Sequence, residues 1–218
     1  SSAASDVYKR QEYNHVKVDD KENLALLERI LKGKKILLLM PGQSISQYKD
    51  EILKKIEAEN LFVITVNFRD ETFDKYSELA FWGSQKRYEH YTDLRKEVTS
   101  LITSNIESDM EDDIIVNYDS FVDRTQEYSD NASLMLMRIL QRVGVVSYYV
   151  AGFDGFTVNG SYYNKTDFSE ERFRSQYESI NKGVAHQLSM FADSLKHPED
   201  IQFVTPVSYT HLRAHETK

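Results

Sequence analysis

The 218-residue sequence contains no cysteine, and this absence removes several kinds of chemistry. Disulfide bonds, thiolate metal ligands and cysteine nucleophiles are all excluded. The absence is compatible with a cytoplasmic protein, which is the location we expect. No apolar run approaches the roughly 20 residues that a membrane-spanning helix needs, so we also expect no membrane span.

Histidine and glycine are present, but they do not have the spacings that mark two familiar kinds of site. None of His15, His90, His186 and His197 stands at the spacing of zinc ligands, so no metal site is predicted. The stretch PGQS at residues 41–44 lacks the GK[ST] ending of a Walker A loop and the three glycines of the dinucleotide fingerprint. A phosphate ligand would therefore have to be bound without either motif.

Both ends of the sequence read as foreign to the protein. Residues 1–11, SSAASDVYKRQ, translate back codon by codon into a transposase sequencing adapter, and residues 207–217 translate back into its partner. Segments of this kind are set aside before fold reasoning. We expect residues 1–11 and 207–218 to be adapter-derived artefacts around a natural segment, 12–206, of a longer protein. The alternative is a basic N-terminal tail and a C-terminal strand.

Acidic residues outnumber basic residues in the chain. The sequence has 35 Asp and Glu against 27 Lys and Arg, which gives a formal net charge of −8. Each suspected tail carries a charge of +1, so the segment 12–206 carries about −10. Nucleic-acid binding needs clustered Lys and Arg that neutralise phosphates. We therefore expect no nucleic-acid partner.

Short β-rich runs alternate with amphipathic helical segments along the chain, as in a parallel sheet covered by helices. The predicted strands lie at 34–40, 61–68, 77–82, 99–105, 112–118, 146–156 with its exit loop, and 201–205. The predicted helices lie at 23–31, 46–60, 130–144 and 169–195, and residues 83–91 are predicted to be a loop. The predicted fold class is α/β: a Rossmann-like, mostly parallel sheet with helices on both faces. A connector helix at 12–33 precedes this domain, which spans 34–206.

The run KKILLLM at residues 34–40 is apolar at almost every position, so it is predicted to be a central strand of the sheet. Ligands of open parallel sheets bind where strands end and loops begin. Small or polar residues follow several predicted strands at this edge. The candidate ligand-binding residues are Gly42, Gln43, Ser44, Ser46, Asn67, Ser84, Arg87, Asp154, Tyr162 and Tyr163.

The loop after the predicted strand at 34–40 is the candidate phosphate loop. Gly42 would let backbone approach a phosphate, Ser44 and Ser46 supply hydroxyls, and the next helix offers its positive N-terminus. Taken alone, however, the stretch PGQS favours an ordinary turn and helix cap over ligand contact. Asp154, between two glycines, fits either a turn cap or a contact to a base, ribose or sugar.

The remaining candidates also keep two interpretations. Asn67 can contact a ligand or satisfy backbone groups at a strand end, and Arg87 can bind an anion or lie on a solvated loop. Tyr162 and Tyr163 can stack on a base or pack under a lid. The acidic run ESDMEDD at 107–113 is interpreted as a solvated turn.

The order of several motifs resembles a known group of Rossmann-like domains. These motifs are KKILLLMPGQSISQY (34–48), ITVNF (64–68), NASLMLMRILQRVGVVSYYVAGFDGF (131–156) and FVTP (203–206). They resemble the C-terminal domain behind aldolases of the hydroxymethylglutaryl-CoA lyase and 4-hydroxy-2-oxovalerate aldolase class in bacterial surface-polysaccharide gene clusters. Residues 13–35 are similar to the connector from that aldolase barrel. The resemblance implies an N-terminal aldolase partner whose active site lies upstream of residue 12.

A more distant resemblance links the chain to the family 42 sialyltransferases, which bind a cytidine-monophosphate sugar. Their glycine-serine loop matches Gly42 and Ser44, their asparagine after the second strand matches Asn67, and their small-residue helix start matches Ala132 and Ser133. Asn131 and Ser133 at this helix start join the ligand-binding candidates. Their glycine-hydrophobic-aspartate strand end matches 152–154. Where that family has its catalytic histidine, this chain has Glu178, a candidate catalytic base.

The two resemblances imply three functions. The first is a nucleotide or nucleotide-sugar binding accessory domain of an aldolase-type fusion, with a cytidine or uridine nucleotide sugar as ligand. The second is a sialyltransferase-like glycosyltransferase that uses the same pocket. The third is a non-catalytic assembly domain. The first two require the polar residues at the strand ends to line one cleft.

Overall fold

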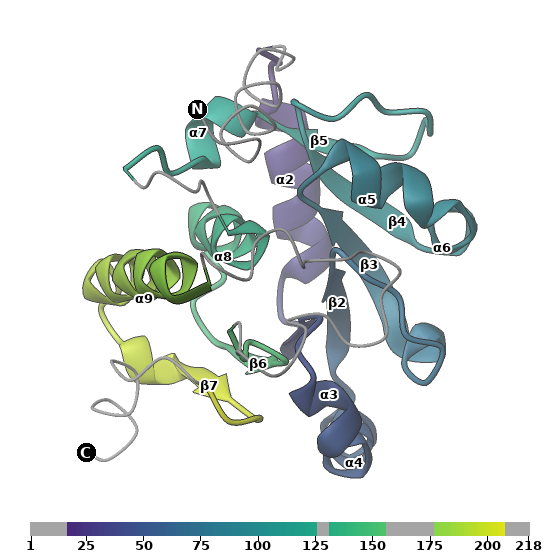
Figure 1. Ribbon diagram of the computed structural model, residues 1–218. Coiled ribbons are helices and arrows are strands. Elements are labelled where there is room, and N and C mark those ends of the chain that lie inside the picture. The colour runs from purple at the N-terminus through teal and green to yellow at the C-terminus, as the bar shows by residue number, and fades with distance from the viewer. Residues whose placement is uncertain (1–16, 126–130, 156–176, 208–218) are drawn as a thin grey trace. The chain divides into compact units, whose positions relative to one another are not determined.

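The fold is described from a computed structural model, in which residues 17–125, 131–155 and 177–207 are described (Figure 1). The strands are β1 (Ile36–Leu39), β2 (Phe62–Val66), β3 (Ser77–Trp82), β4 (Thr99–Thr103), β5 (Ile114–Val116), β6 (Tyr148–Ala151) and β7 (Ile201–Phe203). The helices are α2 (Lys21–Leu31), α3 (Ser44–Gln47), α4 (Lys49–Glu59), α5 (Gln85–His90), α6 (Thr92–Glu97), α7 (Tyr118–Phe121), α8 (Ala132–Arg142) and α9 (Tyr177–Asp193). Two 3₁₀ helices, η1 (Asp74–Tyr76) and η3 (Pro198–Asp200), complete these elements.

The strands in the described ranges form one parallel sheet in the order β5-β4-β3-β2-β1-β6-β7. This arrangement confirms the predicted α/β, Rossmann-like fold class. All four residues of β1 are buried, and β1 lies inside the strand order as the apolar run at 34–40 predicts. A strand buried on both faces needs apolar side chains at successive positions, and Ile36–Leu39 supplies them.

The helix α8 shows why the local sequence selects these elements. Asn131 caps its N-terminus, because the side-chain oxygen accepts the backbone N–H groups of Ser133 at 2.9 Å and Leu134 at 3.3 Å. The chain leaves the helix through Gly144, whose φ of +82° falls in the left-handed region that glycine adopts without strain. Apolar side chains fill the buried face between these two signals. The predicted helix at 130–144 is therefore confirmed.

The chain divides into two compact units, and each is described separately. The first unit comprises Ser1–Lys34 and Val63–Val145 and contains β2 to β5. In this unit α2 lies on one face of the strands, and α5 and α6 lie on the other (Figure 1). Trp82, Tyr88 and Leu94 are fully buried in the core between these two short helices and the sheet. Burial of such side chains stabilises the fold by about 1.5 to 3 kcal/mol each.

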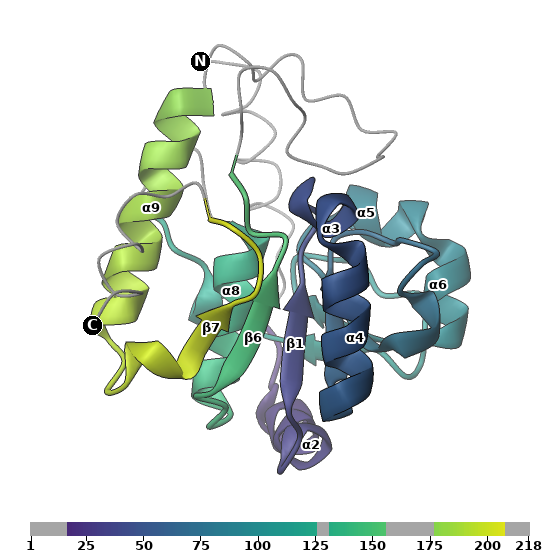
Figure 2. The ribbon, with the colours of Figure 1, turned by 90° about the horizontal axis from the view of Figure 1, so that it is seen from below.

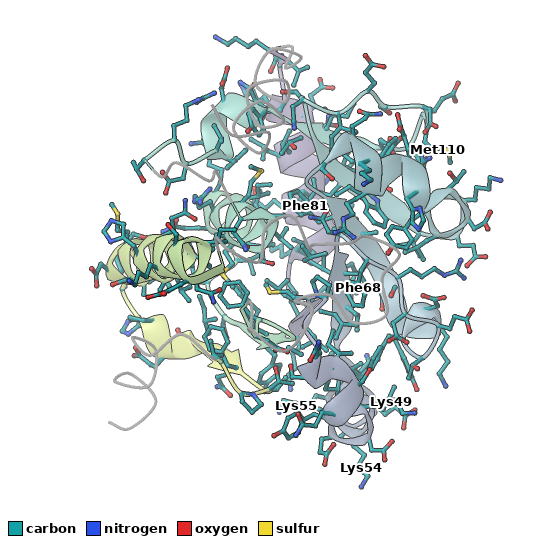
Figure 3. The ribbon with its side chains drawn as sticks, in the orientation of Figure 1. Lys49, Lys54, Lys55, Phe68, Phe81 and Met110 are labelled. Atoms are coloured by element: carbon teal, nitrogen blue, oxygen red, sulfur yellow. The ribbon has the colours of Figure 1, made fainter. Side chains whose placement is uncertain are left out.

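The second unit comprises Lys35–Phe62 and Val146–Lys218 and contains β1, β6 and β7. Figure 2 shows α4 on one side of these strands and α9 on the other. The Tyr149 hydroxyl of β6 donates to Glu59 of α4 at 2.9 Å, and the Lys55 ammonium lies 4.1 Å from the centre of the Tyr149 ring. Lys49, Lys54 and Lys55 project from α4 in Figure 3.

Two details of the predicted elements are wrong. Residues 83–91 are not a loop, because α5 (Gln85–His90) occupies most of this stretch. Ser84 begins α5 by accepting the Arg87 N–H at 3.3 Å, and the buried Tyr88 anchors the helix. The predicted helix at 46–60 is two helices instead, since the backbone at Tyr48 (φ −107°, ψ 25°) separates α3 from α4.

Of the suspected C-terminal adapter, Val207 alone is described, and its side chain is buried at 7% exposure. The suspected N-terminal adapter at 1–11 lies outside the described residues. Across the described ranges, no helix is both long enough and apolar enough to cross a membrane.

Candidate ligand site at the ends of β1 and β6

The strand order reverses direction at β1. The chain proceeds from β1 through β2, β3 and β4 to β5 on one side, and then continues with β6 on the other side of β1. The two strands pair in parallel, with Leu39 opposite Ala151. In open α/β sheets, ligands bind outside the carboxyl ends of the two strands where the order reverses. The loops after β1 and β6 therefore form the candidate ligand site.

Two glycines allow these two loops to touch. A Cβ on Gly42 would collide with the Gly152 carbonyl oxygen and would lie 2.6 Å from Oδ2 of Asp154. A Cβ on Gly152, whose φ is +80°, would collide with the Met40 carbonyl oxygen and lie 2.8 Å from the Ile45 side chain. The Gly42 N–H donates to the Gly152 carbonyl at 2.9 Å and continues the strand pairing into the loops. Close packing within the chain itself thus requires both glycines.

Asp154 joins the two loops through its carboxylate. The Ser44 backbone N–H donates to Asp154 Oδ2 at 2.7 Å, and the Ser44 hydroxyl donates to Asp154 Oδ1. The side chain of Gln43, at the N-cap position of α3, makes no capping hydrogen bond. Asp154 therefore satisfies an N–H at the start of α3, as an N-cap side chain normally does, from 110 residues away.

Burial raises the pKa of Asp154 above its ordinary value of 3.8, while the hydrogen bonds from the Ser44 hydroxyl and N–H oppose this rise. The loop of Asp154 is also tied to β7, because the Gly152 N–H donates to the buried Thr205 hydroxyl oxygen at 2.9 Å. The loop that carries the carboxylate is thus tied to the loop after β1 through Ser44 and to the segment after β7 through Thr205.

This arrangement determines what a ligand can offer at Asp154. The Ser44 N–H and hydroxyl already donate to the carboxylate, so they do not provide a ready anion site, and a phosphate there would face a carboxylate. Each carboxylate oxygen can accept more than one hydrogen bond. Asp154 can therefore accept the hydroxyl groups of a ribose or sugar more readily than Ser44 can bind a phosphate.

The other candidates of the β1 loop are exposed. Gln43 and Ser46 both have exposed side chains, and the Ser46 N–H donates to the Gln43 carbonyl at 3.1 Å within the turn. A ligand at this loop would reach them without displacing the core. Their predicted role as ligand contacts stays a prediction.

Asn67 and its neighbours belong to the first unit. Asn67 follows β2 with a φ of +60°, and its side-chain oxygen accepts the Gly83 N–H at 2.8 Å. A Cβ on Gly83 would lie 2.8 Å from Cβ of Ala132 at the start of α8. Asn67 therefore satisfies a backbone group at the end of β3, the structural role that the sequence left open beside ligand contact.

Three further candidates of the first unit are also accounted for by the fold. Ser84 and Asn131 cap α5 and α8 through their side-chain oxygens, and Ser133 is buried at 3% exposure. Arg87 is buried at 6% exposure on α5, so the solvated-loop interpretation of this residue is wrong. That these first-unit residues line one cleft with Ser44 and Asp154 stays a prediction.

Glu178 lies in the first turn of α9 with 85% of its side chain exposed, and it pairs with Lys182 at 3.1 Å. An exposed pair of this kind is typical of a helix surface, and such pairs contribute little to stability. The proposed catalytic role of Glu178 stays a prediction. Tyr162 and Tyr163 lie outside the described residues.

The acidic run at 107–113 contains a polar network that the sequence analysis missed. The Arg95 guanidinium pairs with Asp109 and lies 3.8 Å from the centre of the Tyr88 ring. The Tyr88 oxygen lies 2.7 Å from Asp109 Oδ1 and 2.5 Å from Asp113 Oδ2, and it accepts the Asp109 N–H at 3.0 Å. Burial raises the pKa of Tyr88 to about 12. No sequence motif links these residues, although the buried Arg95 needs an acidic partner.

A scan against protein-family models, a search of curated proteins and a search of solved structures each gave no match to this chain. The class of the protein is therefore defined by its sheet: an α/β, Rossmann-like fold.

Proposed function

We propose that this chain binds a nucleotide or nucleotide sugar at the carboxyl ends of β1 and β6. The observation that carries the proposal is the contact between Ser44 and Asp154 where the strand order reverses. The carboxyl edge at this reversal is the usual ligand position of the fold class. The close-packed glycines at 42 and 152 hold the carboxylate in a fixed place there.

The ligand part that meets Asp154 is a sugar ring with neighbouring hydroxyl groups. A hydroxyl donates to a carboxylate in a short, charge-assisted hydrogen bond. A phosphate at the same place would repel the ionised carboxylate and would compete with it for the Ser44 N–H. The phosphate of the ligand is therefore directed away from Asp154, toward solvent or toward residues beyond this loop.

The sequence resemblance supplies the biological setting of the proposal. In that setting the chain is the accessory domain of a cytoplasmic aldolase-type fusion in surface-polysaccharide metabolism, and its partner is the N-terminal aldolase domain. The cytidine or uridine nucleotide sugar implied by the sialyltransferase likeness fits a carboxylate that accepts sugar hydroxyls. Transfer chemistry has less support, because the candidate base Glu178 is exposed and paired with Lys182.

Calorimetry tests the proposal with cytidine and uridine monophosphates and with their sugar conjugates. Wild type is expected to bind at least one of them, and Asp154→Ala is expected to weaken that binding about tenfold or more through loss of a charge-assisted hydrogen bond. Asp50→Ala, which removes an exposed carboxylate on α4, is the matched control and leaves binding unchanged. Absence of binding to all four classes of ligand contradicts the proposal and leaves the assembly function.

A transfer assay separates binding from catalysis. The transferase function would be favoured by two results together. Wild type would turn over a bound nucleotide sugar, and Glu178→Gln would lose this turnover while it keeps the wild-type affinity for the nucleotide sugar. Binding without turnover agrees with the accessory function proposed above.

A further inference from the structure

A cavity lies within the first unit and shares no residue with the Ser44–Asp154 site. It has a volume of about 410 Å³, and its lining comes from α2 with its N-cap residue, α7 and α8. This volume is in the range of about 300 to 1,000 Å³ that small-molecule pockets occupy. Leu24 of α2 and Phe121 of α7 supply apolar surface, and Ser120 supplies a hydroxyl.

One face of α8 provides most of the polar lining of this cavity. Arg138, Gln141 and Arg142 stand at positions i, i+3 and i+4, so their side chains leave the helix on the same side. An anion at the exposed Arg142 guanidinium would gain charge-assisted hydrogen bonds.

The polar walls are held in place by backbone contacts. The Arg138 guanidinium donates to the Phe121 carbonyl oxygen, which fixes it between α7 and α8. Asp20, a carboxylate that lines the cavity at the start of α2, accepts the Asn117 N–H at 2.6 Å. Asn23 donates to the Ile115 carbonyl at 2.8 Å and ties the same helix to β5. The three helices therefore present their side chains from fixed backbone positions.

The lining residues that the structure describes carry a net positive charge although the chain is acidic. They include two cations, Arg138 and Arg142, and one carboxylate, Asp20, which already accepts a backbone N–H. Within the described ranges, no hydrogen bond or ion pair engages the exposed Arg142 side chain. Guanidinium groups match carboxylate and phosphate oxygens in paired hydrogen bonds.

We propose that this cavity binds a small organic anion. The carboxylate or phosphate of the ligand meets Arg142, and its apolar part packs on Leu24 and Phe121. The two anionic groups share the chemistry that the guanidinium groups recognise, and the test distinguishes them.

Isothermal calorimetry in chloride-poor buffer tests the proposal with benzoate and phenyl phosphate as probes. Inorganic phosphate lacks the apolar part and benzyl alcohol lacks the charge, so both are expected to bind at least about tenfold more weakly than the better aromatic anion. The tighter of benzoate and phenyl phosphate identifies the anionic group. Equal binding of benzyl alcohol and both anions overturns the proposal, as does the absence of saturable binding by either anion.

Variants of the full chain locate the bound anion. Arg142→Ala is expected to weaken the better probe about tenfold, and Arg142→Lys is expected to restore part of that loss because it keeps the charge. Arg29→Ala removes another exposed arginine, on α2 but outside the cavity lining, and is expected to change nothing. Ser44→Ala is also expected to leave this binding unchanged. Undiminished binding in Arg142→Ala overturns the assignment.

Discussion

Ser44 donates to both oxygens of the Asp154 carboxylate, through its backbone N–H at 2.7 Å and through its hydroxyl. This pair joins the loop after β1 to the loop after β6, and these loops flank the reversal of the strand order. The contact explains why both loops carry a glycine at the point of closest approach. It also fixes a carboxylate at the edge of the sheet where this fold class binds ligands.

Gly42→Ala is expected to destabilise the protein by about 1 to 3 kcal/mol, because the added methyl has no room between the two loops. The new Cβ would lie 2.5 Å from Cγ of Asp154 and would collide with the Gly152 carbonyl oxygen. Urea unfolding followed by circular dichroism measures the effect. If Gly42→Ala had the same free energy of unfolding as wild type, the two loops would be able to move apart without loss of stability, and the prediction would be wrong.

Gly144→Ala is the matched control for steric crowding. A Cβ at Gly144 would meet no atom within 4 Å, so this variant reports only the strain of alanine at a φ of +82°. That strain is about 1 to 2 kcal/mol. Gly144→Ala is expected to leave the pKa of Asp154 unchanged, whereas Gly42→Ala moves it by displacing the carboxylate.

The raised pKa of Asp154 gives the stability a specific pH dependence. A carboxyl whose pKa is higher in the folded state binds its proton more tightly there, so ionisation opposes folding. The stability of wild type relative to Asp154→Asn is therefore expected to fall as the pH rises from about 3.8 through the raised pKa. Urea unfolding of both proteins at a series of pH values measures this difference. An increase over the same interval would contradict the assigned direction.

Ser44→Ala is expected to raise the pKa of Asp154 further. The Ser44 hydroxyl bonds the carboxylate and thereby lowers its pKa, so its removal leaves burial less opposed. Carbon-13 NMR titration of the Asp154 carboxyl in wild type and in Ser44→Ala gives the two titration midpoints directly. Ser46→Ala, which changes an exposed hydroxyl of the same short helix, serves as the control and keeps the wild-type midpoint. A lower midpoint in Ser44→Ala would refute the assigned contribution of the hydroxyl.

Asp109→Ala is expected to destabilise the protein by about 1 to 3 kcal/mol, because it leaves the guanidinium of Arg95 without its carboxylate. Arg95 has a side-chain exposure of 2%, although Asp109 itself is 62% exposed. Asp112→Ala removes an exposed carboxylate from the same acidic run and is expected to change stability by less than about 0.5 kcal/mol. Thermal unfolding of the two variants compares them. If both variants changed the stability by equally small amounts, residues 107–113 would be a solvated turn, as the sequence predicts.

Removal of residues 1–11 and 208–218 is expected to leave the melting temperature within a few degrees of the full chain. The codon match of both segments to sequencing adapters motivates this expectation. Val207 is kept because its side chain is buried. A much larger drop in a thermal scan would show that these segments belong to the fold.

Local patterns predicted the elements whose signals lie within a few residues of one another. The cap at Asn131, the apolar face of α8 and the terminal Gly144 all act locally, and so does the apolar run of β1. The polar stretch that forms α5 was predicted incorrectly as a loop at 83–91, because this helix depends on the packing of Tyr88 against the sheet.

The candidate site could be predicted only in part. Gly42, Ser44 and Asp154 were selected because they follow predicted strands, but the contact between Ser44 and Asp154 joins residues 110 positions apart. Neither the periodicity nor the composition of the sequence predicts such a contact, because the contact depends on the pairing of β1 with β6. For the same reason the sequence assigned Gly42 to ligand approach, whereas the folded chain fills that space with Gly152 and Asp154.

The central claim is that Asp154, held by Ser44, accepts sugar hydroxyl groups of a nucleotide ligand. The most direct measurement compares, by calorimetry, the ribo and 2′,3′-dideoxy forms of the cytidine or uridine nucleotide that binds best. The account predicts that wild type binds the ribo form about tenfold or more tightly, and that Asp154→Asn reduces this preference severalfold. Equal affinity of wild type for both forms, or an unchanged preference in Asp154→Asn, would contradict it.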